Sequence, residues 1–158
     1  MSRAKGEAAR IEFESAIPIL RIFDVKKAKE FYVDWLGFTI DWEHRFEPGL
    51  PVYMQISRSD LHFHLSEHHG DSTPGSAVFV NMKGLRDFHR EITARKYPNL
   101  RPGIRRMPWH ADVMEVVDPF GNRIRFNEYV QVQVAAGGVK ASSSISRKPA
   151  RKKTRSQA

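Results

Sequence analysis

Residues 16–38 read Ala-Ile-Pro-Ile-Leu-Arg-Ile-Phe-Asp-Val-Lys-Lys-Ala-Lys-Glu-Phe-Tyr-Val-Asp-Trp-Leu-Gly-Phe, and this stretch decides the fold. Its first eight residues are apolar apart from Arg21 and include three β-branched isoleucines, which predicts a strand, and Pro18 fits the start of a strand or a sheet edge. Asp24 then stands at the N-cap position of a helix that ends at Gly37. Apolar residues recur in this helix at i, i+3, i+4, i+7 and i+8, namely Ala28, Phe31, Tyr32, Trp35 and Leu36.

Three short strand-like segments follow the helix, at 38–45, 52–57 and 61–65. They are separated by the turn-forming sequences Glu-Pro-Gly-Leu-Pro (47–51) and Arg-Ser-Asp (58–60). The first half of the chain therefore predicts the order β-α-β-β-β.

The same order recurs after the turn-rich stretch 67–75. Strand-like segments are 76–82, 103–107, 112–117 and 123–127, and a helix face is marked by Leu85, Phe88, Ile92 and Lys96. The sequence Asp118-Pro-Phe-Gly-Asn122 predicts a hairpin connection in which Gly121 and Asn122 adopt positive φ. Each half is too small to close a core alone, so we expect two paired βαβββ modules, residues 15–67 and 75–130, in one α+β domain spanning 15–130.

Composition limits the class of protein. The chain has 158 residues, of which 41% are hydrophobic, enough for one domain with a real core. No apolar run approaches the roughly 20 residues that cross a bilayer, and no apolar segment follows the charged start. Cysteine is absent, which excludes disulfides, zinc–thiolate sites, iron–sulfur ligation and cysteine nucleophiles, and a cytoplasmic location is the expectation.

The formal net charge of +8 belongs mainly to the end of the chain. All acidic residues lie at or before Glu128, and residues 1–128 hold 19 basic against 18 acidic side chains. The remaining seven basic residues lie in a stretch rich in Ser, Ala and Gly, so we expect residues 131–158 to be a disordered basic tail. A solvated extension is favoured for it, with weak, non-specific nucleic-acid contact as the alternative. Residues 1–14 are expected to form a flexible arm.

Several motifs together resemble the bleomycin resistance proteins of the glyoxalase, or vicinal-oxygen-chelate, superfamily. In chain order they are Ser15-Ala-Ile-Pro-Ile-Leu20, Asp24-Val25, Glu30-Phe-Tyr32, Leu36-Gly-Phe38, Leu85-Arg-Asp-Phe-His89, Met107-Pro-Trp109 and Asp118-Pro-Phe-Gly-Asn122. The resemblance covers about residues 15–130. It implies a homodimer with curved sheets that enclose clefts between subunits, and an N-terminal arm at Pro18 that exchanges between subunits.

In the enzymatic branches of the superfamily, a His on the first strand of a module and a Glu on its last strand hold a divalent metal. The matching positions here are Ile17, Ala77 and Arg125. None of these side chains ligates a divalent cation. The resemblance therefore implies a protein without the usual metal site, with no catalytic residue and no cofactor assigned.

Four of the seven histidines lie in Leu61-His-Phe-His-Leu-Ser-Glu-His-His69. His62 and His64 share one face of a strand, and His68 or His69 is close enough in sequence to approach them from the next loop. A site for zinc, copper or nickel is one interpretation. A polar sheet face, with Leu61, Phe63 and Leu65 in the core, is the favoured one.

Aromatic residues are the second candidate constellation. In the resembling family, aromatics at the places of Trp42, Phe46 and Trp109 line the cleft and stack on the flat part of the drug. From the residues alone, Trp42 and Trp109 fit a core or a cleft equally well. Polar support is assigned to Asp41, Glu43, Glu47 and His110, although His44 and Arg45 dilute the negative charge that suits a cationic glycopeptide.

The function expected is therefore a non-catalytic antibiotic-binding protein that sequesters bleomycin-family glycopeptides, alone or as metal complexes, and so acts in the response to antibiotic. The alternative is a metal-dependent lyase or dioxygenase that uses His62 and His64. No nucleophile motif, phosphate loop or dinucleotide fingerprint is present to support covalent or nucleotide chemistry.

Overall fold

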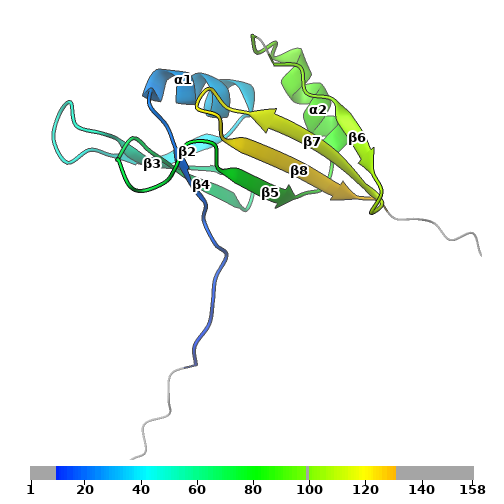
Figure 1. Cartoon of the computed structure of the whole chain (residues 1–158), viewed down its shortest axis with the longest axis horizontal. Helices are drawn as coiled ribbons and strands as arrows, with labels where there is room; N and C mark the ends of the chain where they lie inside the picture. Colours follow the sequence, from blue (N-terminus) through cyan, green and yellow to red (C-terminus); the bar gives the residue numbers. More distant parts are fainter. Residues whose placement is uncertain (1–9, 99, 131–158) are drawn as a thin grey trace, which may run out of the picture.

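Two four-stranded sheets, each with a helical segment packed on it, form the fold in this computed structural model, which describes residues 10–98 and 100–130 (Figure 1). Module 1 comprises β1 (Ile19–Arg21), α1 (Val25–Lys29), the π-helical segment η1 (Glu30–Trp35), β2 (Thr39–His44), β3 (Tyr53–Arg58) and β4 (Leu61–Ser66). Module 2 comprises β5 (Ala77–Asn81), α2 (Leu85–Ala94), β6 (Ile104–Met107), β7 (Ala111–Val117) and β8 (Arg123–Tyr129). The predicted repeat of β-α-β-β-β is confirmed. The predicted basic tail lies outside the described residues.

The two sheets have the same topology, with strand orders β1-β4-β3-β2 and β5-β8-β7-β6. In each module the first strand pairs parallel with the last, and the other strands pair antiparallel. A parallel pair requires a crossover connection, and in each module this connection consists of the helix, which covers one face of the sheet, and the two strands that follow it. Figure 1 shows α1 and α2 on the same side of the molecule, above the sheets. The opposite face of each sheet stays open.

The first helical segment begins where the sequence predicts. The Asp24 side chain accepts a hydrogen bond from the Lys27 backbone N–H at 3.0 Å, which caps α1. The five apolar residues of the predicted face are all buried: Ala28, Phe31, Tyr32, Trp35 and Leu36. The second half of the segment is π-helical, so the prediction of one regular helix is wrong there. The sequence carries no signal for this change of pitch, because the same side chains are buried in either form.

Two local predictions in module 2 are corrected by the structure. Helix α2 ends at Ala94, and Lys96 lies beyond it with a φ of 51°, so Lys96 does not extend the helix face. In the β7–β8 connection, Gly121 has the predicted positive φ, at 90°, whereas Asn122 does not. Asn122 is instead buried, and its side-chain amide donates hydrogen bonds to Asp118 and to the Arg21 carbonyl.

The modules share buried contacts that run between their helices and turns. The Tyr32 hydroxyl donates to Asp118 Oδ2 at 2.7 Å, and the Trp35 indole N–H donates to the Ile92 carbonyl at 2.8 Å. One apolar cluster contains side chains from both modules. Among residues 10–98 and 100–130, no helix has the length and apolar character needed to cross a membrane.

Candidate functional site

The open face of the module 1 sheet carries the candidate site. Along β3, Met54 and Ile56 point into the core, so Tyr53, Gln55 and Ser57 lie on the open face. The antiparallel register sets Gln55 opposite His64 and Ser57 opposite His62 on β4. The prediction that His62 and His64 share a face is therefore confirmed.

A β-bulge in β2 brings two further residues to this face. The pairing with β3 shifts between Ile40 and Trp42, so Asp41 is the extra residue. Asp41 accepts hydrogen bonds from Gln55 Nε2 at 2.8 Å and from Ser57 Oγ at 2.7 Å. The Ser57 bond and then the Gln55 bond lower the pKa of Asp41, which keeps the exposed carboxylate ionised.

Trp42, Tyr53 and His64 form what we call the aromatic wall. The ring of Trp42 stacks on Tyr53 with centroids 5.8 Å apart and 16° between planes, and the His64 ring lies edge-on to both. Trp42 is 41% exposed, so of the two positions that its sequence allows, core or cleft, the core is excluded. Tyr53 is not predictable as a site residue from the sequence, because its partners depend on strand register.

Hydrogen bonds hold the Tyr53 and His64 rings of the aromatic wall in place. His64 Nδ1 lies 2.8 Å from the Tyr53 hydroxyl, and His64 Nε2 lies 3.0 Å from Gln55 Oε1. Burial, and secondarily the nearby His62 charge, lower the pKa of His64, which favours the neutral ring. Since the Gln55 oxygen only accepts, Nε2 carries the proton and Nδ1 accepts from Tyr53. The chain Tyr53–His64–Gln55–Asp41 thus holds the rings in one arrangement.

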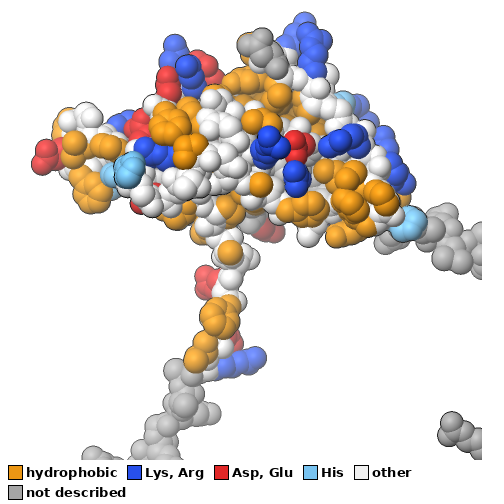
Figure 2. All heavy atoms as spheres, viewed as in Figure 1, with side chains coloured by type: hydrophobic (Ala, Val, Ile, Leu, Met, Phe, Trp, Pro, Cys, Tyr) orange, Lys and Arg blue, Asp and Glu red, His pale blue; other side chains and the backbone are white. Residues whose placement is uncertain are grey.

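The β2–β3 loop extends the wall at one end. Phe46 is 73% exposed and lies edge-on to His44 and His68, with centroids 4.9 and 5.8 Å away. Figure 2 shows histidine beside hydrophobic side chains at this end of the molecule. Glu47 is exposed in the same loop. Glu43 turns the other way, where its Oε2 lies 2.8 Å from Lys29 Nζ of α1.

Trp109 and His110 occupy the turn between β6 and β7. Trp109 is 48% exposed, and His110 shapes the turn with a φ of 58° and a carbonyl that accepts from Val130 N–H. This turn and the β2–β3 loop lie at opposite ends of the molecule (Figure 1). Within one protomer, the structure therefore does not bring Trp109 to the aromatic wall.

The residues present do not fit the metal of the enzymatic branches. Ile17, Ala77 and Arg125 are all exposed, and Arg125 Nε donates to Glu115 at 2.7 Å. Both ring nitrogens of His64 already have partners, and His62 Nδ1 lies 3.2 Å from the Asp60 carbonyl. Within residues 10–98 and 100–130, no group of three or more His, Asp or Glu side chains is arranged to hold a metal ion.

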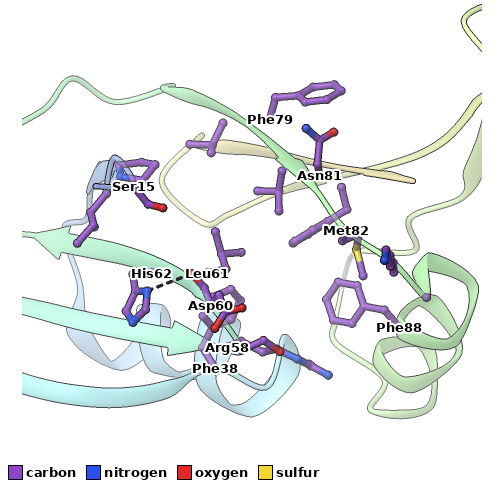
Figure 3. Close-up of a pocket in the computed structure, with 18 of the residues that line it drawn as sticks. Ser15, Phe38, Arg58, Asp60, Leu61, His62, Phe79, Asn81, Met82 and Phe88 are labelled. Atoms are coloured by element: carbon purple, nitrogen blue, oxygen red, sulfur yellow. Dashed lines mark hydrogen bonds between the residues drawn. The ribbon is translucent and has the colours of Figure 1, made fainter. Parts of the chain in front are cut away.

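A groove of about 970 Å³ runs between the modules (Figure 3). One side is formed by the β3–β4 turn with His62, and the other by β5 and α2 with Phe79 and Phe88. Its rim carries an ion pair between Arg58 and Glu91, with 2.6 Å between Nη2 and Oε2. Neither tryptophan of the candidate site lines this groove, and no pattern in the sequence predicts it.

Two paired βαβββ modules, each with one open sheet face, define a glyoxalase-type fold. The chain belongs to the glyoxalase superfamily, because residues 3–133 match the family model described as glyoxalase superfamily protein. A search of curated proteins finds no match.

Solved structures agree on the fold. The bleomycin-binding protein from bleomycin-producing Streptomyces verticillus, complexed with copper(II)-bleomycin, is 26% identical with a TM-score of 0.57, covering 77% of this chain and 100% of its own. TnmS3, an antibiotic binding protein from Streptomyces sp. CB03234, is 18% identical with a TM-score of 0.58 over the same shares. A glyoxalase-related enzyme from Clostridium phytofermentans is 19% identical with a TM-score of 0.59, covering 78% and 100%.

Proposed function

We propose that this protein binds and sequesters, without chemical conversion, a small molecule with a flat aromatic ring system, and that bleomycin-family glycopeptides are the ligands to test first. The observation that carries the proposal is the exposed, hydrogen-bonded aromatic wall of Trp42, Tyr53 and His64. The similarity to the bleomycin-binding protein of Streptomyces verticillus supports the choice of ligand.

The wall suits stacking because its rings are already positioned. Trp42 offers an exposed ring face while Tyr53 supports it from one side. A ligand ring placed on Trp42 gains contact area at little cost in side-chain entropy, since the Asp41–Gln55–His64 hydrogen bonds already restrict the wall.

A homodimer would complete the site. Trp109 lies at the far end of the protomer, so the proposed cleft takes the aromatic wall from one protomer and the β6–β7 turn from its partner. Residues 11–14 are Ile-Glu-Phe-Glu, and Ile11 and Phe13 are 83% and 96% exposed on a segment that extends away from the body (Figure 1). These unburied side chains support the exchange of the N-terminal arm that leads up to Pro18. Light scattering that gives a protomer mass at micromolar concentration would refute the dimer.

Calorimetric titration with metal-free and copper-loaded bleomycin tests the function. The wild-type protein should bind, and Trp42→Ala should weaken binding at least tenfold. Phe23→Ala is the control, since Phe23 is also an exposed ring but packs on Phe120, away from the wall. Absence of binding would refute bleomycin as the ligand. Near-stoichiometric metal in the purified protein, lost with an enzymatic activity in His64→Ala, would favour the lyase or dioxygenase instead.

A further inference from the structure

The open face of the module 2 sheet differs in charge from the aromatic wall. Along β8, Ile124 and Phe126 are buried, so Arg123 and Arg125 lie on the open face. Arg105 lies on the same face of the sheet, on β6. We call Arg105, Arg123 and Arg125 the arginine face.

One carboxylate only partly balances these three cations. Glu115 is opposite Arg125 in the β7–β8 register and accepts a hydrogen bond from Arg125 Nε at 2.7 Å. That bond, together with the charges of all three arginines, lowers the pKa of Glu115. Among the described residues, Arg105 and Arg123 form no ion pair within 4.0 Å. The arginine face therefore keeps an excess of about two positive charges.

An exposed aromatic ring accompanies the arginine face. Phe79 on β5 pairs with Arg125 in the parallel register, and its side chain is 50% exposed. Phe79 and the exposed Ile17 of module 1 line the same groove, which joins this face to the module 1 sheet. Guanidinium groups beside an exposed ring suit a flat ligand that carries a negative group.

The charge difference extends over the whole modules. Residues 10–75 contain 7 basic and 11 acidic side chains, whereas residues 76–130 contain 10 basic and 6 acidic. Figure 2 shows many Lys and Arg side chains over the half that β5–β8 and α2 form. A cleft that takes one wall from each module therefore has an aromatic side and a cationic side.

We propose that the arginine face binds an anionic group, such as a carboxylate or sulfonate, of a ligand whose ring stacks on the aromatic wall. This inference rests on the proposed binding function and refines its class of ligand: a flat aromatic compound with an anionic group should bind more tightly than bleomycin, a cationic glycopeptide that is tested first because of the structural similarity. Arg105 and Arg123 are the groups available to the anion, because Arg125 is engaged with Glu115. A guanidinium offers a carboxylate two parallel hydrogen bonds.

Three probes with one ring system separate charge from stacking: 2-naphthoate, 2-naphthamide and 2-naphthylmethylammonium, each titrated calorimetrically into the full chain. We expect the carboxylate to bind at least tenfold more tightly than the other two. The double variant Arg105→Gln/Arg123→Gln should remove this preference. The matched control, Arg90→Gln/Arg101→Gln, removes two exposed charges from α2 and the loop after it and should retain the preference. Thermal melts confirm that both variants fold.

The outcomes distinguish the two proposals. Equal binding of all three probes, or a preference that survives in Arg105→Gln/Arg123→Gln, overturns the anion site and leaves the stacking function in place. Failure of every probe and of bleomycin to bind overturns the proposed function itself. Trp42→Ala should weaken all three probes by similar factors, because it removes the ring and no charge.

Discussion

Removal of one hydroxyl, in Tyr32→Phe, is expected to weaken the junction between the modules. The Tyr32 ring is fully buried, and its hydroxyl donates to Asp118 Oδ2 at 2.7 Å. Asp118 keeps its other donors, the Asn122 amide and the backbone N–H groups of Phe120 and Asn122. The loss is therefore one hydrogen bond to a carboxylate, worth about 2 kcal/mol, or a fall of roughly thirty-fold in the folded-to-unfolded ratio. Tm should fall by roughly 5–10 °C.

The effect should depend on pH. Burial raises the pKa of Asp118, whereas its hydrogen bonds lower it, so loss of the Tyr32 bond raises it further. A folded-state pKa above the unfolded value gives stability that is present at low pH and is lost as pH rises through the folded pKa. The deficit of Tyr32→Phe should therefore grow from about pH 4 to pH 7 in urea unfolding. Tyr129→Phe, on a largely exposed ring, is the control. A deficit below about 0.5 kcal/mol at pH 7 would refute this account of the junction.

Three further predictions concern a turn, an ion pair and the tail. Gly37→Ala should lower Tm, because Gly37 has a φ of 76°, which is unfavourable for alanine, and because the added Cβ would lie 2.6 Å from side-chain nitrogens of Arg58 and Arg95. An unchanged Tm would show that both arginine side chains move aside without cost. Arg106 and Arg86 lower the pKa of Asp112, so the stability from these ion pairs is present above the unfolded-state pKa and is lost as the pH falls. In urea unfolding, the free energy of unfolding of Asp112→Asn should therefore change less between pH 7 and pH 3 than that of the wild type, and an equal change in both proteins would contradict this pairing. Truncation after Val134 should leave ligand affinity within a few-fold by calorimetry, because every candidate site residue precedes it, and a loss beyond about tenfold would place the tail over the site.

The order of elements was predictable because each boundary has a local cause. Asp24 caps the first helix, Gly37 follows its end with positive φ, and the buried residues recur at helical spacing. Strand alternation also predicts that His62 and His64 share a face, and the register confirms it. These features depend on neighbours within a few positions of the chain.

The composition of the aromatic wall was not predictable, because it depends on register and on one inserted residue. Regular alternation in β2 places Glu43 and Trp42 on opposite faces of the sheet. The structure confirms this, because Glu43 forms an ion pair with Lys29 of α1. Asp41 joins Trp42 only because of the bulge, for which the sequence carries no marker. Tyr53 becomes part of the site through partners on the neighbouring strands, Trp42 on β2 and His64 on β4, which lie about 11 residues away along the chain, so no local pattern could assign it.

The wall also explains why the histidines on this face are unsuited to the chemistry of the enzymatic branches. A metal-ligating histidine needs one free ring nitrogen, and its other nitrogen normally donates to an acceptor that orients the ring. His64 satisfies the second requirement through Gln55 but gives its remaining lone pair to the Tyr53 hydroxyl. For His64 to become a metal ligand, Tyr53 would have to lose its hydroxyl. Positions 17 and 125 would also have to gain acidic or imidazole side chains in place of Ile17 and Arg125. The same hydrogen bonds that occupy both His64 ring nitrogens also hold the Tyr53 ring on which Trp42 stacks.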